Sequence, residues 1–151
     1  MTTIVLVHPE IPHNTGAIGR TCVALDMELV LIRPYGFTLS DRQLKRAGLD
    51  YWQHVRLAEY ADWASFITDR SPRDGQMFLF EDDAPRSFFQ PDYPDDAILV
   101  FGSETKGLPR AIRGAHKACE VSLPMRSAHI RSLNLANTVT AAAYQALRGK
   151  F

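Results

Sequence analysis

Short apolar runs alternate along this chain with longer segments whose apolar residues recur at helical spacing. The runs cover residues 3–8, 29–33, 77–80, 98–101 and 121–123. Each run has the length and composition that predict a β-strand. The first run and the run at 98–101 show no alternation of apolar and polar residues, which is typical of central strands covered on both faces.

The segments between the runs predict helices. Asn14 is a good cap residue followed by apolar residues at helical spacing, so a helix is expected over 14–27. Further helices are expected over 40–47, 59–69 and 133–147. Strands that alternate with helices predict an α/β fold with a mainly parallel sheet. The Pro- and Asp-rich segment 82–96 is interpreted as a loop, and the whole of 1–151 as a single domain.

The composition is that of a globular protein able to bury a core of ordinary size. The chain has 151 residues, 46% of them hydrophobic, and its 17 basic residues balance 17 acidic ones. No apolar run approaches the ~20 residues that span a bilayer, and the first run is too short for a signal peptide. Cys22 and Cys119 stand apart from any metal-ligand spacing. We therefore expect a cytoplasmic protein with reduced thiols, no structural metal and no membrane segment.

The balanced net charge argues against a general binder of polyanions, but the charges are unevenly placed. Basic residues form three clusters: Arg42, Lys45 and Arg46; Lys106, Arg110, Arg113 and Lys117; and Arg126, His129 and Arg131. Acidic residues gather at 81–83 and 92–96. Solvated helix faces would explain any one basic cluster, whereas three clusters beside three polar motifs favour a basic rim around one site.

The first motif, Glu-Ile-Pro-His-Asn-Thr-Gly at 10–16, follows the first strand and is itself followed by Arg20. The start of a helix offers free backbone amides and a positive dipole end, which favour an anion such as an RNA phosphate. Gly16 permits a ligand to approach the backbone closely. For this motif alone, a capped helix with a surface arginine is the alternative.

The second motif, Phe-Gly-Ser-Glu-Thr-Lys-Gly-Leu-Pro at 101–109, follows an apolar strand. Its two glycines and its proline bracket Glu104 and Lys106, so the loop presents backbone donors and acceptors with little side-chain bulk. The spacing is neither that of a GxxxxGK[ST] phosphate loop nor that of a GxGxxG dinucleotide fingerprint. A plain Gly/Pro turn is the alternative.

The third motif joins Leu-Pro-Met at 123–125 to Ser-Leu-Asn-Leu-Ala-Asn at 132–137. Ser132 is a good helix cap, which is its purely structural explanation. Asn134 and Asn137 lie three residues apart, on one face of the expected helix. Such amides need partners if they are buried, and a ligand or a facing subunit would supply them. All three motifs lie where a strand passes into a loop or helix, the usual place for a ligand site in α/β proteins.

The order and content of these motifs resemble those of the SPOUT superfamily of RNA methyltransferases, and most closely the small TrmL (YibK) type. The segments Pro-Tyr-Gly-Phe at 34–37 and Arg-Ala-Gly-Leu-Asp-Tyr at 46–51 extend the resemblance over nearly the full length. The resemblance implies a deep C-terminal trefoil knot, although chains are in general unknotted. It also implies a homodimer that uses S-adenosylmethionine, leaving S-adenosylhomocysteine, to methylate a ribose of RNA.

By motif match, the resemblance assigns site residues. The S-adenosylmethionine pocket would include Phe80, Gly102, Leu123, Ser132 and Leu133. The RNA side would include Asn14, Arg131 and Tyr144, although Tyr144 could equally pack in the dimer interface. Arg20 matches an arginine associated with activation of the ribose 2′-hydroxyl.

A guanidinium is a poor base because it stays protonated. We therefore expect Arg20 to orient the ribose and stabilise the developing alkoxide, with an RNA phosphate sharing the proton. His8, at the end of the first strand, is an alternative base. Two segments depart from the family pattern: acidic residues 81–83 directly follow Phe80, and 126–130 differs in length and charge. Both bear on which RNA is accepted.

The first interpretation is methylation of the wobble nucleotide in a tRNA anticodon stem-loop. The 151 residues leave no room for an added RNA-binding domain, and unpaired bases are the most readable part of an RNA. Ribose methylation of ribosomal RNA is an alternative within the same class. A non-catalytic RNA-binding module and a Rossmann-type oxidoreductase are alternatives of other classes. The set Asn14, Gly16 and Arg20 disfavours the module, and the missing GxGxxG disfavours the oxidoreductase.

Overall fold

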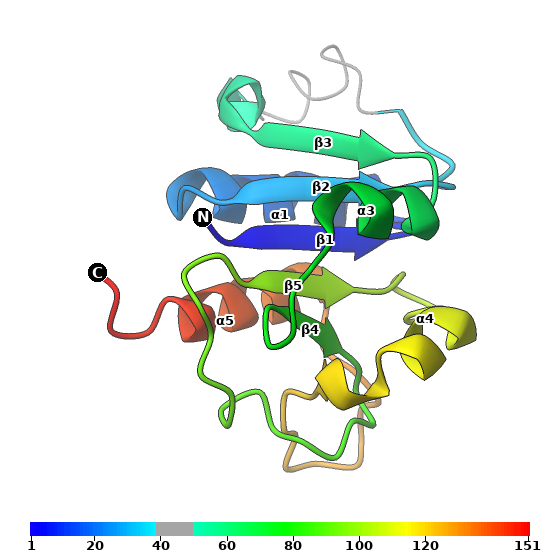
Figure 1. The fold of residues 1–151 in the computed structure, drawn as a ribbon, viewed down its shortest axis with the longest axis vertical. Helices are drawn as coiled ribbons and strands as arrows, with labels where there is room; N and C mark the ends of the chain where they lie inside the picture. Colours follow the sequence, from blue (N-terminus) through cyan, green and yellow to red (C-terminus); the bar gives the residue numbers. More distant parts are fainter. Residues whose placement is uncertain (39–49) are drawn as a thin grey trace.

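A six-stranded sheet lies at the centre of the computed structural model, which describes residues 1–38 and 50–151 (Figure 1). The strands are β1 (Thr3–Val7), β2 (Glu28–Ile32), β3 (Arg56–Tyr60), β4 (Met77–Phe80), β5 (Ile98–Phe101) and β6 (Glu120–Val121). Their order is β3-β2-β1-β5-β4-β6, and every neighbouring pair is parallel. β1 and β5 are the central pair, which confirms what their unbroken apolar runs predicted.

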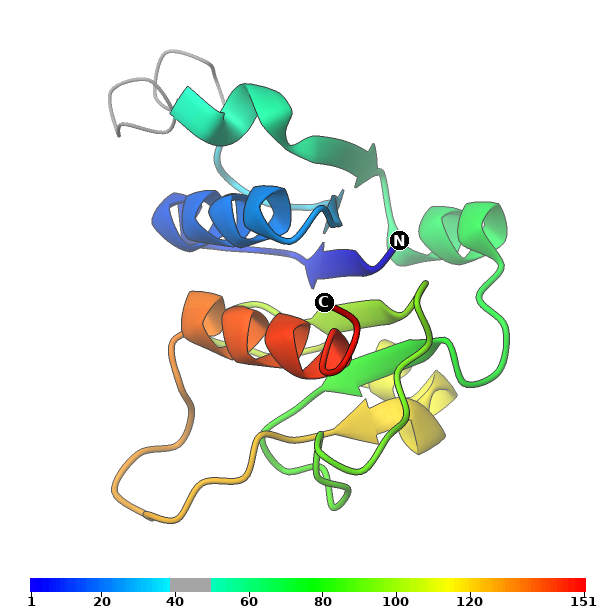
Figure 2. The same cartoon turned by 90° about the vertical axis from the view of Figure 1, so that its left-hand side faces the viewer.

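Helices cover both faces of the sheet, as the α/β interpretation requires. α1 (Pro12–Ala24) and α5 (Leu135–Ala146) lie side by side on one face (Figure 2). α3 (Trp63–Arg70) and α4 (Arg110–Ala115) cover the other face (Figure 1). Two short 3₁₀ helices, η1 (Asp50–His54) and η2 (Lys117–Cys119), lie in the connections.

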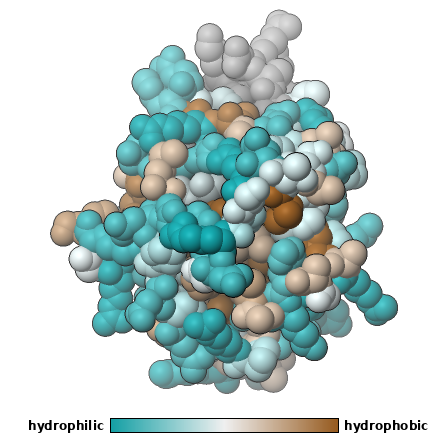
Figure 3. Space-filling model, viewed as in Figure 1, coloured by the Kyte–Doolittle hydropathy of each residue, from teal (hydrophilic) through white to brown (hydrophobic). Residues whose placement is uncertain are grey.

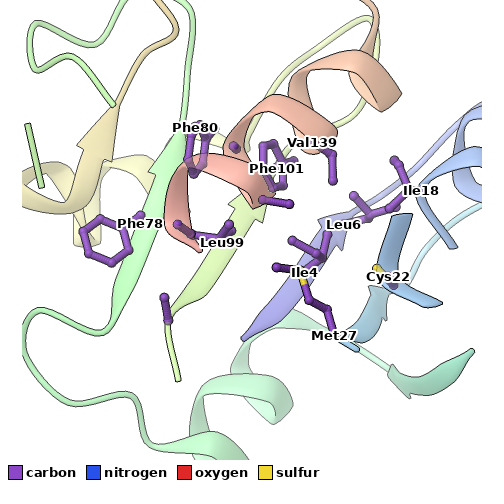
Figure 4. Close-up of a cluster of buried hydrophobic side chains, with 14 of the residues drawn as sticks. Ile4, Leu6, Ile18, Cys22, Met27, Phe78, Phe80, Leu99, Phe101 and Val139 are labelled. Atoms are coloured by element: carbon purple, nitrogen blue, oxygen red, sulfur yellow. The ribbon is translucent and has the colours of Figure 1, made fainter. Parts of the chain in front are cut away.

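The hydrophobic core has two halves because successive side chains of a strand point to opposite faces. Ile4 and Leu6 of β1 pack with side chains of α1 and α5, in the half drawn in Figure 4. Val5 and Val7 pack in the other half with Phe66 of α3. Each fully buried side chain of this kind contributes about 1.5–3 kcal/mol relative to exposure. Burial on both faces explains why β1 shows no polar alternation.

The sequence pattern does not predict β3, and the helix predicted over 59–69 is wrong at its start. β3 is an edge strand whose five residues are exposed or half-buried, so it carries no apolar run. α3 begins only at Trp63, because the Asp62 side chain caps it by accepting a hydrogen bond from the Ser65 backbone N–H at 2.7 Å. The predicted helix at 40–47 lies outside the described residues.

Two predicted helix caps are also wrong. α1 begins at Pro12, after Ile11, so Asn14 lies buried within the first turn instead of capping it. Proline suits this position because its missing N–H would have no helical partner. α5 is capped by Asn134, whose side chain accepts a hydrogen bond from the Asn137 backbone N–H, and not by Ser132. Asn14 and Asn134 are thereby placed for the contacts described below.

The chain changes its direction of travel across the sheet between β1 and β5. From β1 it builds outward through β2 to β3, and it then crosses to the other half to form β4, β5 and β6. The crevice at the carboxyl ends of the strands beside such a reversal is the usual ligand site of an open parallel sheet.

The molecular face seen in Figure 3 is mostly hydrophilic, with apolar residues in small separate patches.

Candidate ligand cavity and its surroundings

A cavity of about 520 Å³ lies at the carboxyl ends of β4, β5 and β6, between the starts of α1 and α5. Residues 80–82, 101–107 and 131–135 contribute most of its lining. Most of the predicted site residues line it: Asn14, Phe80, Gly102, Leu123, Arg131, Ser132 and Leu133. Segments from all three motifs therefore meet around one space, although they lie far apart in the sequence.

One wall of the cavity is aromatic and aliphatic. The rings of Phe80 and Phe101 stack with 4.6 Å between centroids and 18° between planes, at the ends of adjacent strands. Figure 4 shows this pair beside Val139 of α5. Leu123 and Leu133 extend the apolar lining. This surface suits a flat, weakly polar ring, which would lose contact with water when it binds.

The loop after β5 is tightly closed and depends on glycine. The backbone groups of Ser103 and Gly107 exchange two hydrogen bonds of 3.2 and 3.0 Å. A Cβ on Gly102 would lie 2.0 Å from the Gly107 carbonyl carbon and 2.2 Å from the Leu108 nitrogen, so no other residue fits without moving the backbone. Gly107 has φ +68°, in the left-handed region that glycine adopts readily. The loop therefore offers backbone groups at the cavity with little side-chain bulk, as predicted.

Glu104 joins this loop to the start of α1. Its carboxylate accepts hydrogen bonds from the backbone N–H groups of Glu10, at 2.8 Å, and Ile11, at 3.2 Å. The Asn14 side-chain NH₂ also donates to it, and the Asn14 side-chain oxygen accepts a hydrogen bond of 3.0 Å from the Asn134 side chain. The amides at the start of this helix were predicted to favour an RNA phosphate, and the two amides directly before it are bound by a carboxylate of the same chain. The motifs contained all these residues, but their spacing alone could not predict this contact.

Glu81 supports the same loop from the other side. Its carboxylate accepts a hydrogen bond of 2.6 Å from the Leu108 backbone N–H. Burial raises the pKa of the Glu81 carboxyl, against the opposing effects of the Leu108 bond and of Arg113 nearby. Burial also raises the pKa of Asp82, and both side chains line the cavity. The acidic departure noted in the sequence is thus part of the cavity wall.

Arg113, predicted to belong to a basic rim, turns toward acidic side chains instead. It donates hydrogen bonds of 2.7 Å to both Glu120 and Asp83. These bonds raise the pKa of the guanidinium, Glu120 contributing most. Lys106 and Arg131 do line the cavity. The cluster of Arg42, Lys45 and Arg46 lies outside the described residues.

Arg20 and Tyr144 do not line this cavity. Arg20 is exposed, six residues beyond Asn14 and thus about 9 Å further along the axis of α1. Its guanidinium carbon lies 4.9 Å from the centroid of the Tyr51 ring, and the Tyr51 hydroxyl donates a 2.7 Å hydrogen bond to the Gly16 carbonyl. Tyr144 is 53% exposed on α5 and stacks with Phe151, with 6.2 Å between centroids.

Three further features concern ligands and partners. His8 lines a second cavity, on the far side of the loop after β5. Within residues 1–38 and 50–151, no group of three or more His, Cys, Asp or Glu residues is placed to hold a metal ion. Of the helices in those ranges, none is long and apolar enough to cross a bilayer.

Comparisons with known proteins agree on one family. The profile of the SpoU rRNA Methylase family matches residues 1–144. A Listeria monocytogenes protein is 45% identical over 96% of this chain and 86% of its own length. The tRNA (cytidine(34)-2'-O)-methyltransferase of Burkholderia cenocepacia is 40% identical over 98% of this chain and 95% of its own length.

Solved structures share the same fold. A structure determined to study 2-OH methylation of C/U34 on tRNA is 42% identical to this chain, with a TM-score of 0.89 over 98% of this chain and 95% of the other. The SpoU methyltransferase AviRb of Streptomyces viridochromogenes, solved in complex with AdoMet, has a TM-score of 0.80 over 98% of this chain and 60% of its own. At 23% identity, AviRb supports the fold alone.

Proposed function

Because this chain belongs to the SpoU rRNA methylase family, we propose that it transfers a methyl group from S-adenosylmethionine to the ribose 2′-hydroxyl of tRNA nucleotide 34, a cytidine or uridine. The observation that carries the proposal is the meeting of three loop segments around the first cavity. The specific substrate is supported by full-length relatives that act, by name, on this nucleotide. The fold is the α/β fold of the SpoU methyltransferases, with its C-terminal trefoil knot.

The residues of the first cavity fit S-adenosylmethionine chemically. Phe80, Leu123 and Leu133 offer an apolar surface for the adenine ring. The methionine part carries an ammonium group and a sulfonium, and the carboxylates of Glu81 and Asp82 provide negative charge nearby. Burial disfavours both carboxylates in the ionised form, so a bound cation would also relieve their cost. When bound, the cofactor supplies an activated methyl group, so the protein has only to orient the oxygen and help remove its proton.

The remaining residues have positioning roles in this proposal. The bonds of Glu104 and Asn14 hold the loop after β5 against α1, which fixes one wall of the cavity. Arg131 offers a cation at the rim for an RNA phosphate. Arg20 orients the ribose and stabilises the developing alkoxide.

The proposal includes a homodimer that acts in the cytoplasm, with 1–151 as one domain. Arg20 does not line the cavity of its own chain, so a second copy that brought Arg20 to that cavity would complete the site. The exposed aromatic rings of Tyr144 and Phe151 support an interface beside α5, because such rings are enriched where proteins associate. Gel filtration with light scattering gives the mass directly, and a monomer that methylates tRNA would contradict this part.

The test of the proposed activity is transfer of labelled methyl from S-adenosylmethionine to bulk tRNA and, separately, to ribosomal RNA. We expect label in the ribose of a tRNA nucleotide with wild type, and a loss of about 100-fold or more with Arg20→Ala. Label in ribosomal RNA alone would show that the substrate is ribosomal RNA, the alternative within the same class of enzyme. Cofactor binding without transfer to either RNA would support a binding module instead.

A further inference from the structure

A second cavity, of about 750 Å³, lies at the carboxyl ends of β1, β2 and β5. It is separate from the first cavity but shares a wall with it, since Ser103, Lys106 and Gly107 line both. Its place beside the β1–β5 reversal is where open parallel sheets bind ligands. None of the roles proposed above uses this space.

The walls of the second cavity suit a flat, partly polar ring. Pro9, Pro34 and Pro109 give rigid apolar surface, and Tyr35 adds a half-buried aromatic ring. Burial raises the pKa of the Tyr35 phenol to about 12, so the ring carries no charge at neutral pH. Bases stack on such rings irrespective of their sequence, with a typical contribution of about 1–3 kcal/mol each.

His8 supplies polar recognition in the same space. It has φ +54°, in the left-handed region, which is uncommon for residues other than glycine. Its Nδ1 is buried and has no hydrogen-bond partner among the described residues. A buried polar atom without a partner and a strained backbone on one residue are typical of functional positions.

The charged residues around the cavity are mixed in sign. Glu10 and Lys106 both line it, and Arg33, whose guanidinium carbon lies 4.7 Å from the centroid of the Tyr35 ring, is paired with Glu59 at 2.7 Å. Lys106 is therefore the cation of the lining that could meet a phosphate. Lys106 is exposed on the shared wall, where a strand of RNA passing from one cavity to the other would place a phosphate. The second cavity thus adjoins the proposed methylation site across the wall that carries Lys106.

We propose that the second cavity binds an unpaired base of the substrate RNA, next to the nucleotide that is methylated. In this arrangement Tyr35 and the prolines contact the faces of the base, His8 contacts its edge, and Lys106 pairs with the linking phosphate. The inference rests on the proposed function for the identity of the RNA. It adds a site that reads the context of the target, since bases in loops are free to be splayed out and stacked on protein rings.

The test is a double-mutant cycle on RNA binding, in which one change is made in the protein and the other in the RNA. The probe is the anticodon stem-loop of a tRNA that accepts methyl from the wild-type protein, with an abasic residue placed at one loop position at a time. Dissociation constants are measured by fluorescence anisotropy for wild type, Tyr35→Leu and His8→Asn. Phe89→Leu is the matched control, because Phe89 is an exposed ring that lines neither cavity. S-Adenosylmethionine affinity and thermal unfolding verify that each variant is folded.

We expect one abasic position beside the methylated nucleotide to weaken wild-type binding about tenfold, and Tyr35→Leu to weaken binding of the intact loop similarly. Combining the two should add nothing, because they remove the same contact. Penalties that simply multiply, with Tyr35→Leu no different from Phe89→Leu, would overturn the second site while leaving methyl transfer intact. A wild-type protein that neither binds nor methylates any RNA would instead remove the proposed function, and this inference with it.

Discussion

Asn14 and Glu104 lie 90 residues apart in the sequence, yet the Asn14 amide donates a 3.4 Å hydrogen bond to the Glu104 carboxylate. Asn134, which caps α5, donates to the other end of the same Asn14 amide. One buried side chain therefore connects the loop after β5 with the starts of α1 and α5. Because each of these segments lines the first cavity, the shape of the cavity depends on this small network.

Glu104→Gln is expected to weaken the network without emptying its space. The amide retains one acceptor oxygen, but its NH₂ group cannot accept from the backbone amides of Glu10 and Ile11. We expect a loss of about 1–3 kcal/mol in the free energy of unfolding and weaker S-adenosylmethionine binding. Urea denaturation and calorimetric titration measure the two effects. Thr105→Val, which removes a hydroxyl donor to Glu10 but leaves Glu104 in place, is the control. Equal cofactor affinity in Glu104→Gln and wild type would show that the network does not shape the cavity.

Gly102→Ala is expected to be strongly destabilising because the new methyl group would meet backbone atoms on the far side of the loop. The cost should be about 3 kcal/mol, with S-adenosylmethionine binding lost at accessible concentrations. Gly114→Ala is the matched control, because nothing lies within 4 Å of the added Cβ and the position is helical. That variant should keep wild-type stability or gain up to about 1 kcal/mol. If the two variants unfold at the same denaturant concentration, the close approach at Gly102 is not a constraint in solution.

The raised pKa of Glu81 predicts the direction in which the free energy of unfolding changes with pH. Burial raises its pKa above the ordinary value of 4.5, so the folded state binds the proton more tightly than the unfolded state does. The free energy of unfolding should therefore fall as the pH rises from 4.5 through the raised value, and Glu81→Gln should remove this decline. Denaturation of both proteins between acidic and neutral pH measures the difference. A stability difference that does not change with pH would contradict the sign.

Asp96 is the control of opposite sign for that experiment. Arg73 donates hydrogen bonds of 2.6 and 2.7 Å to its carboxylate and holds the pKa of Asp96 below its usual range. This contribution to stability is present above the unfolded pKa and is lost as the pH falls through the lower, folded value. Asp96→Asn should therefore cost most at neutral pH and least in acid.

Removal of Arg113 should destabilise the fold through Glu120. The Glu120 side chain is only 5% exposed, and Arg113 bonds to both of its carboxylate oxygens. Arg113→Met leaves that carboxylate buried without its partner, which should cost about 3 kcal/mol. The exposed Arg110, in the same helix, is the control, and Arg110→Met should change stability by less than about 0.5 kcal/mol. Double substitution with Glu120→Gln should recover part of the loss if the unpaired charge is its cause.

Arg20→Lys tests whether the proposed catalytic role depends on the planar guanidinium. Lysine keeps the positive charge but lacks the planar fork of N–H donors that binds two oxygens in parallel. We expect kcat for methyl transfer to fall about 100-fold while the dissociation constant for S-adenosylmethionine stays unchanged. Near-full activity would contradict bidentate orientation of the ribose. Tyr51→Leu, which removes the ring beneath Arg20, should lower kcat by a smaller factor.

The sequence predicts the parts of this fold where burial leaves a pattern. The runs at 77–80 and 98–101 coincide with β4 and β5 because all their side chains are buried. β3 could not be predicted in the same way, since its edge position leaves Leu57 exposed among polar neighbours. The caps of α1 and α5 were predicted from residue type alone, whereas Asn14 is used for a contact made only after folding.

The candidate site likewise has features that the sequence predicts and others that it does not. The resemblance to a known family predicted residues that gather at the first cavity, at the carboxyl edge where the loops of a parallel sheet usually bind ligands. Nothing local predicts that Glu104 would occupy the amides before α1, or that Arg113 would turn toward Glu120. The second cavity, with His8 and Tyr35, involves chain segments whose proximity depends on strand order. The roles of the residues at the first cavity stay predictions, as do those of Arg20 and Tyr144.

The loop that carries Ser103, Lys106 and Gly107 lines both cavities, so the two cavities share one stretch of backbone. A molecule in either cavity that displaces this loop changes the affinity of the other cavity, and thermodynamic reciprocity makes the factor equal in both directions. If RNA tightens the hold on S-adenosylmethionine about tenfold, the cofactor must tighten the hold on RNA about tenfold. If both cavities bind ligands, this shared loop couples the two binding equilibria, and no hinge or moving domain is needed.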